Sequence, residues 1–415
     1  MQTSDTSLVA KRSFRHLWAP ILGIGLTQMI GWGTSFTAIT ILGTSIGRDL
    51  QMAREAVFGG VTVMMIVSGL LAPRFGRRID AQGARGLMVP GALVGAVALL
   101  VIGVARGPIS FWFGWGLFGL SVAMMMTNAA VPALVQIAGA DARRAVTIYT
   151  VITGVTSAVF LPLTSWIESQ VGWRGTFLAF SLMFLCVCLP IHMAVLPTER
   201  PLRQRSSDAK SDVSWDGLLP ERQRRLGFWL ITAWMALQAI IVWGFNLQVI
   251  DILQDAGIGH AAAISLWMLA GPSQAAARLG DLLSGGRYGV MTLALTGAAL
   301  APIGFAIAFM AGVSNWTMAV LAIGFGIGQG LYAVARSMVP LRLFGMKTYG
   351  ETIGLLSLPL NIACAAAPLL FSLLVARAGA TAAMWVAGVA GLLSFVAVLV
   401  LGRIASRAAT VADAE

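Results

Sequence analysis

Long apolar runs, separated by short polar segments, recur along almost the whole 415-residue chain. A run of about 20 apolar residues is long enough to cross the hydrocarbon core of a membrane as an α-helix. The runs are continuous and do not alternate with polar residues, which favours helices over the strands of a β-barrel. The pattern predicts an all-α polytopic membrane protein with twelve spans, at residues 17–41, 56–73, 86–105, 108–137, 145–167, 176–196, 227–251, 261–283, 289–311, 314–340, 350–376 and 381–402.

One longer polar segment interrupts the runs near the middle of the chain. Residues 197–226 are rich in Pro, Ser, Asp and Arg and have no sustained apolar periodicity, which is typical of a linker. We therefore predict an N-terminal six-helix bundle over residues 1–196, a cytoplasmic linker over 197–226 and a C-terminal six-helix bundle over 227–415.

The two predicted halves carry a weak internal repeat. Several residues of the first half recur in the corresponding span of the second half, at a separation of 206 to 211 residues. The pairs are Gly116 and Gly324, Pro132 and Pro340, Pro162 and Pro368, Gly172 and Gly379, and Trp32 and Trp243. A parallel repeat of six spans is the arrangement of transporters whose two halves rock around a site at the membrane midplane.

Composition and charge agree with a membrane protein and exclude other classes. Only 11% of the residues are charged, whereas soluble domains have about 25%. The net charge of +11 comes mainly from basic residues between spans, on the side of the N-terminus, so we expect no nucleic-acid partner. The same asymmetry predicts that both termini lie in the cytoplasm. We further expect a monomer in a bacterial inner membrane, surrounded by lipid. The three cysteines lie inside apolar runs and indicate neither a disulfide framework nor a metal site.

The segment after the second span reads GRRIDAQGAR and is the clearest short motif. Its glycines, Gly76 and Gly83, permit a tight turn and close helix packing, and the carboxylate of Asp80 can meet basic side chains or helix N-termini. We interpret Gly76, Asp80, Gly83 and Arg85 as parts of a gate, although an ordinary basic loop is the simpler alternative.

This loop, the twelve spans and the central linker resemble the major facilitator superfamily. The resemblance implies two six-helix bundles around a central cavity and secondary transport by alternating access. The first span, the GRRIDAQGAR loop and the turn Gly172-Trp173-Arg174 look like bacterial members related to monocarboxylate porters. Those relatives carry an essential arginine in the eighth span, where Arg278 stands here, and Gln274 occupies the place of their aspartate partner.

Arg278 is a basic residue inside the predicted eighth span, and its position at membrane depth requires an explanation. An arginine at membrane depth costs about 2.5–3.5 kcal/mol on insertion scales, so it indicates a function or a partner. It can bind an anionic substrate, form an ion pair with Asp281, or extend its side chain to the membrane edge. At helical spacing it shares a face with Trp267, Gly271, Gln274 and Asp281. Asp281 is our candidate for proton coupling, because the first six spans contain no deep carboxylate.

Further polar and aromatic residues at membrane depth are candidates for the cavity wall. The predicted substrate-binding residues are Arg278, Gln274, Gln28, Trp32, Asn128, Tyr149, Asn246, Gln329, Tyr332 and Asn361. For any one of them, a hydrogen bond to a neighbouring helix is an alternative role. We place Arg336, near the inner end of the tenth span, among the gating residues.

The sequence does not predict an enzyme, a cofactor or a metal site. It has no phosphate-binding loop and no H-E-x-x-H motif, so we expect an ion gradient to drive transport. The leading hypothesis is secondary transport of a small organic anion such as a monocarboxylate, together with a proton. The alternatives are an exporter of amphipathic or neutral compounds and a non-transporting membrane sensor on the same scaffold.

Overall fold

In the computed structural model, which describes residues 14–198 and 217–412, every regular element is a helix. The six spans of the N-terminal half are interrupted in several places by short 3-10 or π-helical turns. In chain order the elements are η1 (Phe14–Leu17), α1 (Trp18–Trp32), η2 (Gly33–Thr37), α2 (Ala38–Asp49), α3 (Arg54–Gln82), α4 (Arg85–Gly103), α5 (Pro108–Met125), α6 (Thr127–Ala138), η3 (Gly139–Asp141), α7 (Ala142–Gly154), α8 (Thr156–Met183), η4 (Phe184–Cys188) and α9 (Leu189–Val195).

The C-terminal half repeats this plan with fewer interruptions. Its elements are α10 (Glu221–Ile240), η5 (Ile241–Phe245), α11 (Asn246–Asp255), α12 (His260–Trp267), α13 (Ala270–Leu283), α14 (Val290–Ala311), α15 (Asn315–Phe344) and α16 (Tyr349–Ala412). The eighth span, predicted as one helix over 261–283, is divided into α12 and α13 by a turn at Met268 and Leu269.

Two glycines let the chain reverse its direction, one within α8 and one within α16. Gly172 within α8 has φ 68° and Gly379 within α16 has φ 80°, backbone conformations that a side chain with a Cβ rarely adopts. Each reversal separates two spans, the fifth from the sixth and the eleventh from the twelfth. Eight helical stretches of the described chain are long and apolar enough to cross a membrane; Pro108–Val195 contains the predicted fourth to sixth spans, and Tyr349–Ala409 the eleventh and twelfth. The predicted eighth span is not among them, because α12 and α13 have only 8 and 14 residues. The matched geometry of Gly172 and Gly379 confirms that the repeat places them at equivalent positions.

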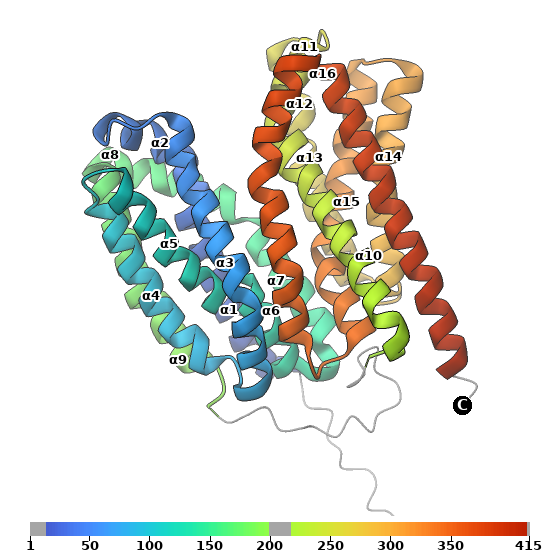
Figure 1. Cartoon of the computed structure of the whole chain (residues 1–415), viewed down its shortest axis with the longest axis horizontal. Coiled ribbons are helices and arrows are strands. Elements are labelled where there is room, and N and C mark those ends of the chain that lie inside the picture. Colours follow the sequence, from blue (N-terminus) through green and yellow to red (C-terminus); the bar gives the residue numbers. More distant parts are fainter. Residues whose placement is uncertain (1–13, 199–216, 413–415) are drawn as a thin grey trace, which may run out of the picture.

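The helices form two bundles of six spans each (Figure 1). We call the end where α9 stops and α10 starts the linker end, and the end with Gly172 and Gly379 the far end. The bundles meet at the linker end and lean apart toward the far end, where α2 and α11 lie (Figure 1). The fold class is therefore the predicted one. The predicted domain boundaries stay a prediction, since most of the linker (residues 199–216) and residues 1–13 and 413–415 lie outside the described chain.

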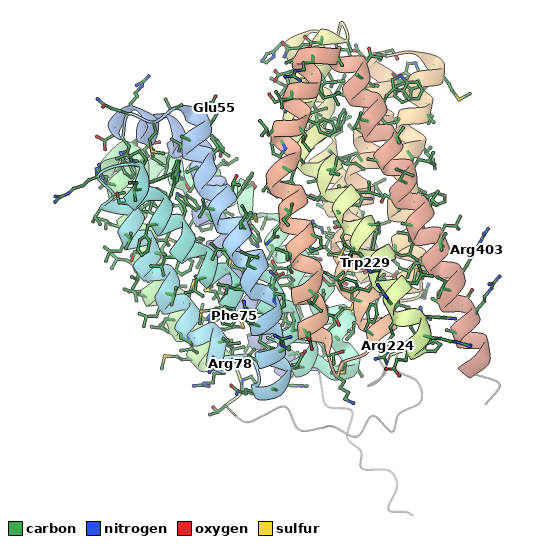
Figure 2. All side chains as sticks on the ribbon, in the orientation of Figure 1. Glu55, Phe75, Arg78, Arg224, Trp229 and Arg403 are labelled. Carbon is green, nitrogen blue, oxygen red and sulfur yellow. The ribbon has the colours of Figure 1, made fainter. Side chains whose placement is uncertain are left out.

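Aromatic packing inside each bundle and apolar residues outside it fit a lipid environment. Trp115 is fully buried among phenylalanines of the N-terminal bundle, whereas Leu93, in the middle of α4, and Ile303, in the middle of α14, are 48% and 53% exposed. Arg78 and Arg224 lie at the linker end of the bundles, as Figure 2 shows. Exposed large apolar side chains in the middle and charges at the end are the distribution expected of membrane-spanning helices.

Several helices extend beyond their predicted ends. The second span was predicted to end at Pro73, but α3 continues to Gln82, and α15 ends at Phe344, four residues past the predicted end. Hydropathy detects only the part of a helix that matches the lipid core. The basic turns that follow stay helical because their backbone hydrogen bonds do not depend on side-chain polarity.

Candidate functional site between the two bundles

A cavity of about 320 Å³ lies between the bundles, at the lower end of the size range of small-molecule pockets. Nine helices contribute to its wall: α1, α3, α5, α6 and α7 of the first half, and α10, α13, α15 and α16 of the second half, together with the π-helical turn η5. The wall is formed by Trp32, Met65, Ser68, Val122, Met126, Thr127, Asn128, Tyr149, Thr150, Thr153, Gln238, Ala239, Val242, Trp243, Gln274, Arg278, Gln329, Tyr332, Ala333, Arg336, Ser337, Leu360, Asn361 and Cys364. Among the described residues, two arginines and no carboxylate line it, so its net charge is positive.

Arg278 on α13 is 91% buried and reaches across to the other bundle. Its side chain is 9% exposed, and its Nη1 donates a hydrogen bond of 2.7 Å to the backbone carbonyl of Thr150. Gly154 makes room for this contact, because a Cβ there would collide with Nη1. Thr150 lies near the C-terminal end of α7, where the helix dipole favours a cation. The Nε of Arg278 is buried without a hydrogen-bond partner, so the guanidinium has an unused donor at the cavity.

Asp281 does not pair with Arg278. Its Oδ1 lies 2.7 Å from Nη2 of Arg143 on α7, and its Oδ2 accepts a hydrogen bond of 3.1 Å from the hydroxyl of Thr147. The intrahelical ion pair that we considered for Arg278 is thus not formed. Side chains on a helix lean toward its N-terminus, so the long Arg278 side chain extends away from Asp281, which follows it. The short Asp281 carboxylate instead faces the start of α7.

Arg336 lies in the cavity wall, and its predicted role at the gate stays a prediction. Sequence alone placed it near the inner end of its span. The helix continues to Phe344, four residues past the predicted end of the span, so Arg336 lies about one turn farther from the helix end than predicted. Among the described residues, no carboxylate forms an ion pair with Arg278 or Arg336.

Eight of the ten predicted substrate-binding residues lie in the cavity wall. They are Trp32, Asn128, Tyr149, Gln274, Arg278, Gln329, Tyr332 and Asn361. The other two make interhelical hydrogen bonds behind it. The amide of Gln28 donates to the carbonyl of Met125 at 2.7 Å, and the side-chain oxygen of Asn246 accepts from the indole of Trp267 at 2.7 Å.

Gln238 is a wall residue that the sequence analysis missed. It is 1% exposed and accepts a hydrogen bond of 3.1 Å from the amide of Gln329. The internal repeat contained the signal that could have found it, because Gln238 follows Gln28 by 210 residues, within the range of the other repeat pairs.

The predicted gate loop contacts the other bundle at the linker end. The carboxylate of Asp80 accepts hydrogen bonds from the backbone N–H groups of Gly350, at 2.8 Å, and Glu351, at 2.9 Å, in the first turn of α16. A carboxylate at a helix N-terminus is favoured by the unpaired N–H groups and by the helix dipole. Nearby, Nη1 of Arg77 lies 3.2 Å from the carboxylate of Glu351. Asp80 therefore caps a helix that belongs to the opposite bundle.

Close packing of α3 on α16 supports this cap. A Cβ on Gly76 would collide with the carbonyl of Gly350, and one on Gly354 would collide with the carbonyl of Ala72. Small residues at such a contact let two helix backbones approach closely. The remaining two predicted gate residues act within their own bundle. Gly83 ends α3 with φ 84°, and Arg85 donates a hydrogen bond of 2.7 Å to the carbonyl of Leu196.

An aromatic contact joins the bundles on the far side of the cavity. Phe36 in η2 and Trp243 in η5 lie edge to face, with ring centroids 4.4 Å apart and an interplanar angle of 85°. Both belong to π-helical turns in the first span of their half. Such turns frequently occur at functional sites. Trp243 also lines the cavity, so this pair adjoins the cavity toward the far end.

Comparison with known proteins agrees with this architecture. Residues 21–284 match the Major Facilitator Superfamily. No curated relative matches the chain by sequence. Among solved structures, the human organic anion transporter MFSD10 (TETRAN) is similar with a TM-score of 0.69 and 16% identity, over 92% of this chain and 99% of that one.

Two sugar transporters share the same fold. FucP from E. coli, solved in the outward conformation, has a TM-score of 0.67 and 13% identity over 93% of this chain and 99% of that one. The proton:xylose symporter XylE, bound to 6-bromo-6-deoxy-D-glucose, has a TM-score of 0.67 and 12% identity over 92% and 95%. At these identities the likeness shows the fold alone.

Proposed function

The chain belongs to the Major Facilitator Superfamily and is a multi-pass membrane transporter, and on this premise we propose that it carries a small organic anion by alternating access. The observation that carries the proposal is the charge of the cavity. Arg278 and Arg336 line it, no described carboxylate does, and the Nε of Arg278 has no partner. A guanidinium at membrane depth is costly unless an anion or hydrogen-bond acceptors compensate it. A carboxylate bound through the guanidinium fork supplies both. The fold of the human organic anion transporter is compatible with this substrate class.

We further propose that transport is coupled to a proton through Asp281. Its carboxylate is 3% exposed and is stabilised by Arg143, which belongs to the other bundle. When the linker ends separate, this ion pair must break, and a lone buried carboxylate is strongly disfavoured. Uptake of a proton by Asp281 removes that cost. The coupling group then lies at the interface that opens, outside the substrate cavity.

The charge distribution also supports our proposal for the orientation. Basic residues at the linker end, such as Arg78 and Arg224, favour placing that end on the cytoplasmic side of a bacterial inner membrane. The bundles meet at this end, which corresponds to an outward-facing state (Figure 1). We propose that the protein functions as a monomer, because one chain forms both walls of the cavity.

Flux through proteoliposomes tests the proposal. Purified protein is reconstituted with a pH-sensitive dye inside, and radiolabelled carboxylates are supplied outside. We expect uptake of an organic anion with acidification of the lumen. Arg278→Ala should abolish uptake, and Asp281→Asn should abolish the proton signal while anion exchange continues.

The matched control is Arg377→Ala, which removes a cation from an exposed position near the far end. It should leave uptake unchanged. Equal loss in Arg278→Ala and Arg377→Ala would contradict a role in anion binding. Efflux of hydrophobic dyes without anion dependence would favour an exporter, and no flux of any solute would favour a sensor. Full activity of Arg278→Lys would exclude recognition through a guanidinium fork.

A further inference from the structure

The two cavity arginines are held at nearly the same depth by the packing of α13 against α15. A Cβ on Gly326 would collide with the carbonyl of Ala270, and one on Gly330 would lie 2.5 Å from the carbonyl oxygen of Gln274. The residue numbers differ by 56 in both pairs, so the two helices run parallel with a constant register. The same difference places residue 334 level with Arg278. Arg336 is two residues further, which corresponds to about 3 Å along the helix axis.

This register brings two fixed positive charges to one wall of a small cavity. Both guanidinium groups line the same space of about 320 Å³. Neither has an ion-pair partner among the described residues, in contrast to Arg143, which has Asp281. The two like charges repel each other in a region of low dielectric constant. A monoanion leaves one of them uncompensated, whereas a dianion compensates both.

Other polar side chains of the cavity bond to neighbouring helices and do not compensate the positive charge of the two arginines. The amide nitrogen of Gln329 donates a hydrogen bond to the side-chain oxygen of Gln238. The amide nitrogen of Asn361 donates a hydrogen bond of 3.1 Å to the backbone carbonyl of Met65. Asn128 accepts a hydrogen bond of 2.8 Å from the hydroxyl of Ser357. These groups hold helices together, while the Nε of Arg278 stays unpartnered in a residue that is 91% buried. The positive charge of the cavity is therefore uncompensated, and a negatively charged ligand would compensate it.

We propose that the cavity selects small organic anions with two negative charges, such as short dicarboxylates, with one carboxylate at Arg278 and the other at Arg336. This inference rests on the proposed anion transport and narrows its substrate class from small organic anions to those with two negative charges. Arg278, already bonded to Thr150, binds the first carboxylate through its remaining donors. Arg336, on the adjacent helix, determines whether a second carboxylate is accepted.

Ligand binding to the full-length purified protein tests the assignment. The probes are chain-matched acids at pH 7.5, butyrate against succinate and valerate against glutarate, measured by calorimetry and by thermal shift. We expect each dianion to bind about ten- to a hundredfold more tightly than its monoanion, the effect of one additional charge-assisted contact. Arg336→Gln should remove this preference by weakening dianion binding alone, and Arg336→Lys should retain most of it. Arg377→Gln, at an exposed position, should change neither affinity.

The outcomes separate this inference from the proposed function. Equal affinities for monoanions and dianions in the unmodified protein would overturn the dianion assignment while leaving anion transport intact. So would an equal loss of both affinities in Arg336→Gln, since that indicates a general packing role. Absence of binding by every anion, with binding of a neutral sugar such as xylose, would overturn both.

Discussion

Arg143 of α7 and Asp281 of α13 form an ion pair across the two bundles, with 2.7 Å between Nη2 and Oδ1. Their side chains are 14% and 3% exposed, so water screens the pair little. Nη1 of the same arginine also donates to the backbone carbonyls of Gly286, at 3.2 Å, and Tyr288, at 2.5 Å. Arg143 thus fastens the start of the fifth span to the loop between the eighth and ninth spans. The cap of Asp80 on α16 fastens the equivalent elements of the opposite halves.

Arg143→Ala should shift the protein toward a state in which the linker ends are apart. Removing one partner of a buried ion pair costs about 3–5 kcal/mol, because the other charge stays buried. Spin labels at the exposed positions Gln82 and Lys347, measured by pulsed electron resonance, should show a longer distance across the linker end.

The neighbouring Arg144 supplies the control for this prediction. Its guanidinium lies 4.2 Å from the ring of Phe14, inside the N-terminal bundle. Arg144→Ala removes the same charge and should leave the distance unchanged. An identical distance distribution in Arg143→Ala would contradict a role of the Arg143–Asp281 ion pair in holding the linker ends together.

Gly76→Ala should separate α3 from α16. The new Cβ would collide with the carbonyl of Gly350, which is backbone and cannot turn aside, so the helices must move. Overpacking of this kind costs about 1–3 kcal/mol. The same label pair should report the separation, and uptake should slow because the linker ends no longer close fully. Gly86→Ala is the matched control, since a Cβ there meets nothing within 4 Å. If both substitutions behave alike, close helix packing is not what Gly76 provides.

Trp243→Ala should make the cavity more accessible from the far end. The edge-to-face contact with Phe36 contributes about 0.5–1.5 kcal/mol beyond the buried area, so its loss should raise access about two- to tenfold. The native Cys364 lines the cavity and can report this change. In a protein with the other cysteines replaced by serine, a membrane-impermeant maleimide should react faster with Cys364 in Trp243→Ala. Trp166, 64% exposed, is the control position, and equal rates in Trp243→Ala and Trp166→Ala would argue against an aromatic barrier.

Gly330→Ala should weaken anion binding without touching any cavity side chain. A Cβ at Gly330 lies 2.5 Å from the carbonyl of Gln274, so α13 must move away from α15 and carry Arg278 with it. We expect a loss of stability of about 1–3 kcal/mol and weaker anion binding, read by thermal unfolding and calorimetry. Gly324 on the same helix is the control, because a Cβ there is at an ordinary 3.5 Å from the carbonyl of Leu300. Unchanged binding in Gly330→Ala would show that the register of the two helices is not critical.

The local sequence pattern was sufficient to predict the helical segments and eight residues of the cavity wall. Apolar runs predicted the helices of both bundles. Eight of ten predicted binding residues line the cavity, because a polar residue at membrane depth must face protein or a ligand. Gln28 and Asn246 were indistinguishable from the others by sequence, since a buried amide that bonds a neighbouring helix has the same local signature.

The ion-pair partners of the charged residues, and their depth in the bundles, depend on the packing of helices that are distant in the chain. Arg278 and Asp281 are three residues apart in the sequence, which suggested an ion pair between them. In the structure Asp281 pairs with Arg143 instead, because of the side-chain directions on α13 and the proximity of α7. The sequence placed Arg336 near the inner end of its span, but α15 continues four residues past the predicted end, and Arg336 lines the cavity.

The sequence by itself therefore determined the membrane location of the spans, the twofold repeat and the presence of unusual arginines, since each of these depends on the polarity of single residues or runs. The tertiary structure decided which charges are compensated. The contacts of Gly326 and Gly330 with α13 set the register that brings Arg278 and Arg336 into one cavity. No local pattern contains that register, because it arises from the fit of two helix surfaces about 50 residues apart in the chain.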